Sequence, residues 1–178
     1  MKAAIYTKFG PPEVLHLQDV EKPVPQANEV LIKVHATSVV KEDPDMRASP
    51  GFNGLLRPRH AILGQELAGE IDSAGAGVTR FRPGDPVYGI DLFGAYAEFK
   101  RMPADGALAI KPANLSYAEA ASIPNGALTA LPFLRDQGKI QAGQTVLIYG
   151  ASGSVGAAAV QLAKYFGAMV TGVCSAAN

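Results

Sequence analysis

Seven residues near the end of the chain have the composition of a phosphate-binding loop. The run Gly150-Ala151-Ser152-Gly153-Ser154-Val155-Gly156 follows an apolar segment, Thr145 to Tyr149, and precedes a segment with helical periodicity. Glycines at such a junction allow a tight turn and a close approach of the backbone, so that N–H groups at the helix start face negative phosphates. The order strand, glycine loop, helix therefore predicts a site for the pyrophosphate of a dinucleotide.

The spacing of the loop is Ala151-x-Gly153-x-x-Gly156, with alanine in place of the first glycine of G-x-G-x-x-G. By itself this spacing also fits a tight strand-to-helix turn in another α/β protein. The context favours a dinucleotide, because a β-branched strand precedes the loop, a small-residue helix follows it, and a second strand comes next. We expect the cofactor to be bound by residues Ala151, Ser152, Gly153, Ser154, Val155 and Gly156.

The choice between NAD and NADP is usually made about 20 residues after the loop, where Asp or Glu binds the ribose 2′-OH of NAD. Residues 173–178 contain neither. Ser175 leaves room for a 2′-phosphate and has a hydroxyl to bond it, which predicts NADP(H). The alternative is that Ser175 only begins a loop, since no Arg or Lys lies there to pair with the phosphate.

Composition argues against binding to nucleic acid or membranes and against a disulfide-linked fold. Sixteen Lys and Arg residues balance sixteen Asp and Glu residues, so no bulk charge favours nucleic acid or an anionic membrane. Residues 1–12 contain no apolar signal region, and no apolar stretch approaches the roughly 18 residues of a membrane span. Cys174, the only cysteine, excludes an internal disulfide. We expect a cytoplasmic protein whose partner is a small-molecule electron acceptor.

Short alternating apolar runs separated by glycine and proline turns dominate the first two thirds of the chain. Such spacing is typical of a partly closed β-barrel. In the third run Val30, Ile32 and Val34 alternate with Lys33 and His35, giving one apolar face. The expected strands are Ala3 to Thr7, Val14 to Val20, Glu29 to Ser38, Leu67 to Ser73, Pro86 to Ile90 and Ala95 to Arg101.

The pattern changes near Pro112. Ser116 and Glu119 have the spacing of a capping box and predict a short helix that Pro124 interrupts. A second helix is expected at 126–137, with Pro132 disturbing it, and a β-α-β unit with a parallel strand pair at 145–174. The fold class is thus α/β plus β, with domains at 1–122 and 123–178.

The motifs together resemble the medium-chain dehydrogenases/reductases, in particular their quinone oxidoreductase-like branch. The resemblance runs through the whole chain. It is carried by Met1-Lys2-Ala3-Ala4, Pro12-Glu13-Val14-Leu15, Ile62-Leu63-Gly64-Gln65-Glu66-Leu67-Ala68-Gly69, Arg82-Pro83-Gly84-Asp85, Gly94-Ala95-Tyr96-Ala97-Glu98, Lys111-Pro112-Ala113-Asn114-Leu115-Ser116, Leu128-Thr129-Ala130, and Gln141-Ala142-Gly143 before the strand and glycine loop.

This resemblance implies a GroES-like barrel followed by a Rossmann domain that binds NADPH. It also implies a length about twice that of this chain, so that only the first β-α-β unit of the Rossmann fold would be included. We therefore expect an incomplete amino-terminal part of such an enzyme, which would be a homodimer at full length.

Zinc-dependent members of this family have ligands that this sequence lacks. Residues 39–43 contain no Cys, Gln65 stands where a His would precede Glu66, and Cys174 lies in the other domain. A tetrahedral zinc site cannot be assembled from these residues. We expect no metal site and a zinc-independent reaction, hydride transfer from NADPH to a quinone or an activated double bond, in which conjugation spreads the developing negative charge.

The resemblance also places residues after the third strand near the nicotinamide. The family often has Asn where this chain has Val40 and Tyr where it has Asp45. Lys41 and Asp43 remain as candidate catalytic residues, and Thr129, in the Leu-Thr-Ala segment, is implied to contact the cofactor. The alternative for Lys41, Asp43 and Arg47 is an ordinary solvated or ion-paired surface charge.

Two other functions remain open at this point. One is a non-catalytic fragment or binding module, consisting of a GroES-like barrel with half a nucleotide site. The other is an enoyl-reductase unit, which shares the same motifs.

Overall fold

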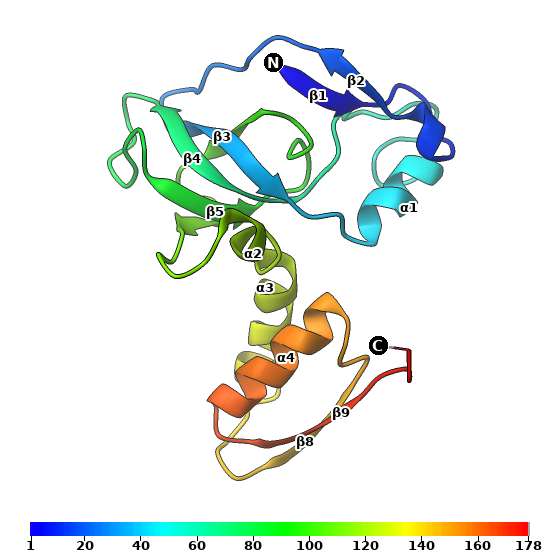
Figure 1. Cartoon of the computed structure of the whole chain (residues 1–178), viewed down its shortest axis with the longest axis vertical. Helices are drawn as coiled ribbons and strands as arrows, with labels where there is room; N and C mark the ends of the chain where they lie inside the picture. Colours follow the sequence, from blue (N-terminus) through cyan, green and yellow to red (C-terminus); the bar gives the residue numbers. More distant parts are fainter. Residues whose placement is uncertain (178) are drawn as a thin grey trace. The chain divides into compact units, whose positions relative to one another are not determined.

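The alternating runs of the first 121 residues form antiparallel strands. The structure, a computed structural model, describes residues 1–177 and divides into two compact units, with the boundary between Ala121 and Ser122. In the first unit, β3 (Glu29–Thr37), β4 (Glu66–Ala74) and β5 (Pro86–Ile90) lie side by side (Figure 1). With β6 (Phe99–Pro103) and β7 (Leu108–Ile110) they form one sheet in the order β6-β3-β4-β5-β7.

The apolar face of this sheet makes the main core. The β3 residues Val30 and Ile32 are fully buried, as the alternation predicted, and pack with Leu67, Val87 and Met102 from the neighbouring strands. A separate hairpin of β1 (Lys2–Ile5) and β2 (His16–Asp19) is joined by the short helix η1 (Pro12–Val14). Tyr6, Val14 and Leu63 form a second core cluster.

The structure places a helix after β3, where the sequence analysis expected neither a helix nor a strand. This helix, α1 (Glu42–Ala48), has Asp43 and Asp45 in its first turn and Arg47 in its last, an order that suits the helix dipole. Pro44 is tolerated there because the N–H groups of a first turn have no intrahelical acceptor. The β7 strand was also missed, and β6 begins four residues later than expected.

Local signals near residue 116 predicted the next helices well. Ser116 and Glu119 form the capping box: the Ser116 N–H donates to Glu119 Oε2 at 2.8 Å, and the Glu119 N–H donates to Ser116 Oγ at 3.2 Å. Helix α2 (Tyr117–Ala121) follows. Pro124 begins α3 (Pro124–Pro132), and after Pro132 the chain continues in a wider helical turn, η2 (Phe133–Gln137).

The second unit contains a β-α-β arrangement. Strands β8 (Thr145–Tyr149) and β9 (Met169–Val173) pair in parallel, from Thr145 opposite Met169 to Tyr149 opposite Val173. Helix α4 (Ser154–Tyr165) connects them (Figure 1), and Gly167, with φ +82°, turns the chain into β9. The parallel pair, helix and terminating glycine are as the sequence predicted.

Candidate functional site

The glycine loop joins β8 to α4 in a conformation that needs its glycines. Gly150 has φ +78°, and its N–H and that of Ala151 both donate to the carbonyl of Val173, at 2.8 and 3.0 Å. A Cβ atom at Gly156 would lie 2.0 Å from the Gly150 carbonyl oxygen, closer than any side chain tolerates. The loop is therefore folded back on the start of α4 and fixed to the end of β9.

The alanine in the first glycine position is accommodated by the neighbouring strand. A Cβ atom at Gly172 of β9 would stand only 2.9 Å from the Ala151 methyl carbon. Glycine at 172 thus supplies the space that glycine at 151 would otherwise supply. This packing accommodates the departure of the loop from G-x-G-x-x-G.

Helix α4 begins at the surface. Gly153 is its N-cap, and Ser152, Gly153, Ser154 and Val155 are exposed. The first N–H groups of an α-helix have no intrahelical acceptor, and the helix dipole places partial positive charge there. The loop therefore presents backbone donors and a favourable potential to an anionic group, as a phosphate site requires.

The other two residues predicted to bind the cofactor lie on different elements of this unit. Thr129 is exposed on α3, and Ser175 is exposed two residues beyond β9. Helix α3 passes very close to α4, since a Cβ atom at Gly126 would lie 2.5 Å from the Ser154 carbonyl oxygen. Both side chains are accessible, and their roles in binding the cofactor stay predictions.

In the first unit, the candidate catalytic residue Asp43 is buried at the start of α1. Its Oδ1 accepts the N–H of Gly64 at 3.3 Å, and its Oδ2 accepts the N–H of Val40 at 3.1 Å and the hydroxyl of Tyr96 at 2.7 Å. Only 2% of the residue is exposed. Both carboxylate oxygens are thus committed to holding together three segments of the chain, which favours a structural role over proton transfer.

The Tyr96 hydroxyl is a hydrogen-bond donor in this network. Besides Asp43 Oδ2, it has the Ser38 carbonyl within hydrogen-bonding distance, at 3.2 Å. Burial, together with the hydrogen bond to the Asp43 carboxylate, raises the pKa of the Tyr96 phenol above its usual value of 10. The hydroxyl therefore remains protonated at neutral pH. Sequence reasoning missed Tyr96 as a partner of Asp43, although Tyr96 stands in one of the motifs that carried the family resemblance.

A second buried carboxylate, Glu66, lies at the start of β4. The Ser38 hydroxyl donates to Glu66 Oε2, and the Thr37 hydroxyl donates to the Glu66 carbonyl at 2.7 Å. Glu66 is 1% exposed. The end of β3 is therefore fixed to the start of β4 by side chains from both strands, next to the Asp43 network.

The two other charged candidates after β3 differ in placement. Lys41 is exposed at the N-cap of α1. Arg47 is buried and donates to the Gly10 carbonyl, while the Gly10 N–H donates to the Arg47 carbonyl at 3.0 Å. Arg47 therefore ties α1 to the segment after β1, and the alternative of a solvated charge is wrong for it.

Beside α1 the first unit has a cavity of about 300 Å³. Three polar side chains, Glu42, Asp45 and Gln65, share its lining with Met46, Phe52 and Leu92. Gln65 is the residue that the family resemblance led us to expect in place of a zinc-binding histidine. The sequence had singled out Gln65 and Asp45 only as departures from family patterns, and did not show that they face one cavity.

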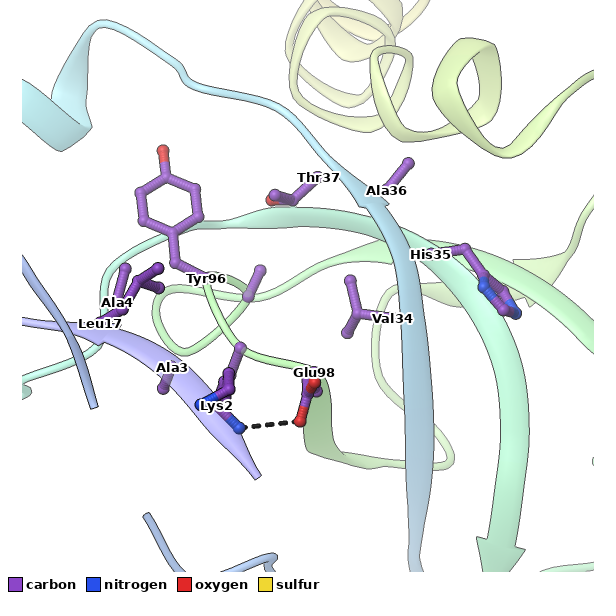
Figure 2. Close-up of a pocket in the computed structure, with 12 residues that line it drawn as sticks. Lys2, Ala3, Ala4, Leu17, Val34, His35, Ala36, Thr37, Tyr96 and Glu98 are labelled. Atoms are coloured by element: carbon purple, nitrogen blue, oxygen red, sulfur yellow. Dashed lines mark hydrogen bonds between the residues drawn. The ribbon is translucent and has the colours of Figure 1, made fainter. Parts of the chain in front are cut away.

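Figure 2 shows a second cavity of the first unit, of about 400 Å³. Aliphatic residues, among them Leu17 and Val34, form much of its wall. The Lys2 N–H donates to Glu98 Oε2 at 2.8 Å, and the Tyr96 hydroxyl is directed away from that pair (Figure 2). Its lining also includes five polar side chains, Lys2, His35, Thr37, Tyr96 and Glu98, of which Glu98 already accepts the Lys2 N–H.

Within residues 1–177, no three His, Cys, Asp or Glu side chains come together as a group that could hold a metal ion. In the same residues no helix is long and apolar enough to cross a membrane.

The comparisons with known proteins agree with this architecture. Residues 26–112 match the alcohol dehydrogenase GroES-like domain. The chain is 39% identical to a quinone oxidoreductase of Sus scrofa over 174 residues, which are 97% of this chain and 52% of that protein. It spans about half the length of the curated relatives it matches.

Solved structures give the same result. The quinone oxidoreductase from Coxiella burnetii is 37% identical with a TM-score of 0.86, covering 100% of this chain and 57% of that one. The CurK enoyl reductase is 31% identical with a TM-score of 0.90, covering 99% and 55%. The Escherichia coli quinone oxidoreductase complexed with NADPH is 31% identical with a TM-score of 0.84, covering 99% and 54%.

The first unit thus contains a GroES-like domain of the alcohol dehydrogenase type. More particularly, the predicted resemblance to quinone oxidoreductase-like medium-chain dehydrogenases/reductases is confirmed.

Proposed function

We propose that the protein is an NADPH-dependent, zinc-independent oxidoreductase that transfers a hydride to a quinone or an activated double bond. The observation that carries this proposal is the glycine loop, where Gly156 lies so close to Gly150 that any side chain would displace it. The relatives that bear the name quinone oxidoreductase, and the neighbour complexed with NADPH, support the same activity.

The loop residues fit a dinucleotide. In this proposal the pyrophosphate is held at the start of α4 by Ser152, Gly153, Ser154, Val155 and Gly156. Ala151 supports the turn by packing on Gly172 of β9. Thr129 and Ser175 would be further contacts of the cofactor. In this proposal residues 123–178 begin a Rossmann domain, and 1–122 form the catalytic domain. When bound, NADPH supplies the hydride.

The proposed absence of zinc restricts the acceptor. Without a Lewis acid, a simple ketone lacks the charge stabilisation that its reduction needs, whereas a quinone or an enone spreads the developing charge by conjugation. Hydrogen-bond donors then suffice. Gln65, in the position of the absent zinc ligand, offers such a donor.

The test is NADPH oxidation by the intact natural protein with a panel of quinones and enals, followed by the loss of nicotinamide absorbance. We expect turnover that survives treatment with a chelator and is faster with NADPH than with NADH. Binding of NADPH without turnover of any acceptor would contradict the proposed activity and support a binding module. Loss of turnover on chelation would contradict zinc independence.

A second function, reduction of an enoyl substrate, is favoured by one observation: the CurK enoyl reductase has a TM-score of 0.90 with this chain. Acceptor preference separates the two. Turnover of an enoyl thioester well above that of any quinone would make the enoyl-reductase assignment the better one.

A further inference from the structure

The cavity beside α1 has the size of a site for one small molecule. Its volume of about 300 Å³ lies at the lower end of the range for ligand pockets. Met46, Phe52 and Leu92 give it apolar surfaces from three different segments of the first unit. Phe52 also stacks on Phe93, with ring centroids 6.1 Å apart and planes 20° from parallel, which holds one wall in place.

Gln65 supplies a hydrogen-bonding group to this cavity. Among the residues that the structure describes, its side-chain amide has no hydrogen-bond partner, while its backbone carbonyl accepts the N–H of Asp91 at 2.9 Å. The backbone of Gln65 is therefore fixed and its amide remains available. The amide N–H of a side chain that lines the cavity suits a carbonyl oxygen of the ligand.

Glu42 and Asp45 give the cavity a negative rim. No ion pair or side-chain hydrogen bond involves either carboxylate within residues 1–177. Arg47 of the same helix is turned to the Gly10 carbonyl, and Lys41 is exposed at the N-cap beside Glu42; neither of these basic side chains lines the cavity. Two carboxylates without an ion-pair partner repel an anionic ligand and leave a neutral one unaffected.

We propose that this cavity binds a small, flat conjugated carbonyl compound without negative charge, with Gln65 donating to its carbonyl oxygen and with Glu42 and Asp45 excluding anionic analogues. The inference rests on the proposed function, in that this ligand would be the electron acceptor. It adds that the acceptor is uncharged or cationic, so that carboxylated and phosphorylated acceptors are rejected.

The test measures binding to the 178-residue chain, without cofactor. The probes are 1-tetralone and its ring carboxylate, which have the same ring system and do not add to the exposed thiol of Cys174. Two-dimensional NMR titration gives both affinities and identifies the residues that shift. We expect 1-tetralone to shift Met46, Phe52 and Gln65, and the carboxylate to bind about tenfold more weakly or worse.

The double variant Glu42→Gln/Asp45→Asn should bring the two affinities within about threefold of each other, because it removes the repulsion. Glu21→Gln, at an exposed position on the connection from β2 to β3, is the matched control and should preserve the wild-type ratio. Gln65→Leu should weaken 1-tetralone by about fivefold, the usual effect of one lost hydrogen bond. The NMR spectra also show whether each variant is folded.

Several results would overturn the inference: no binding of 1-tetralone, equal binding of both probes to the wild type, or an unchanged ratio in the double variant. Shifts confined to residues outside the cavity would do the same. Failure of the proposed function would be seen differently, as absent NADPH oxidation by the intact protein, and would leave the charge discrimination in place.

Discussion

Asp43 in the first unit and the glycine loop in the second differ in whether their polar groups are bonded within the protein or exposed at its surface. The Asp43 carboxylate is buried and accepts three hydrogen bonds from Val40, Gly64 and Tyr96. The glycine loop uses two N–H groups to fix itself to Val173 and leaves the start of α4 at the surface. A polar group whose hydrogen bonds are all made within the protein supports the fold, whereas exposed N–H donors at a helix start are suited to binding a ligand.

The strongest test of this contrast is Gly156→Val. Because even a Cβ atom there would lie 2.0 Å from the Gly150 oxygen, the loop must move away from α4. We expect NADPH affinity of the intact protein to fall by more than about 100-fold, and the second unit to lose about 3 kcal/mol of stability from overpacking. Nicotinamide fluorescence measures the first effect and thermal unfolding the second.

Gly153→Ala tests whether a ligand approaches the loop backbone, because the added methyl group should affect NADPH binding without disturbing the packing of the protein. A Cβ atom at 153 would meet only the Gly150 oxygen at 3.5 Å, an ordinary contact, and φ of −74° suits alanine. The fold should keep its stability to within about 0.5 kcal/mol. If a pyrophosphate approaches this backbone, NADPH affinity should still fall, by about tenfold or more. Unchanged affinity in Gly153→Ala would place the phosphates elsewhere.

Asp43→Ala tests the other half of the comparison. It leaves the N–H groups of Val40 and Gly64 without their acceptor and the Tyr96 hydroxyl with only the Ser38 carbonyl, so we expect a loss of about 3 kcal/mol in the free energy of unfolding by urea. Asp45→Asn, two residues along the same helix but exposed, is the control and should change stability by less than about 0.5 kcal/mol. A stable but inactive Asp43→Ala protein would instead make Asp43 catalytic.

The sequence predicted those elements whose signals are local. The β-α-β unit at 145–174, the Ser116–Glu119 capping box and the apolar face of β3 all depend on neighbours within a few residues. Helix α1 was missed because its seven residues are too few to show an apolar period, although Asp43 and Arg47 have the order that a helix dipole favours.

The parts of the site that could not be predicted depend on contacts distant in sequence. Tyr96 reaches Asp43 across 53 residues, and Gln65 meets Asp45 at one cavity through the pairing of β3 with β4. No periodicity carries that information. The alanine at position 151 depends on Gly172, because the space that its methyl group needs is supplied by β9, which follows α4 in the sequence.

Tyr96→Phe sharpens the account of the Asp43 network. Phenylalanine keeps the ring that packs on Gly64, where a Cβ atom would lie 2.4 Å from Tyr96 Cδ1, and removes only the hydroxyl. Asp43 keeps its two backbone donors, so we expect a loss of about 1 kcal/mol, well below that of Asp43→Ala. In the double variant the two losses should not add, because both remove the same hydrogen bond. Additive losses, measured by urea unfolding, would show that Tyr96 and Asp43 act independently.

The smallest expected effect lies in an exposed cluster that contrasts with Asp43. Glu70 accepts the Tyr117 hydroxyl at 3.2 Å and lies 3.3 Å from His35 Nε2. The hydrogen bond from His35, followed by that from Tyr117, lowers the pKa of Glu70 below 4.5. A carboxylate with a lowered folded-state pKa stabilises the protein above the unfolded value, and this contribution is lost as the pH falls through the folded value.

Glu70→Gln should therefore lower the melting temperature slightly at pH 7, where Glu70 is ionised, and should reduce by a similar amount the loss that accompanies acidification below about pH 4.5. Both changes should be small because the pair is solvent-exposed. Tyr117→Phe, which removes one of the two partners, should reduce the loss on acidification by a smaller part. The measurement is thermal unfolding of the three proteins across this pH range. Identical acid dependence in all three would mean that the surface cluster, unlike the buried Asp43 network, contributes nothing to the fold.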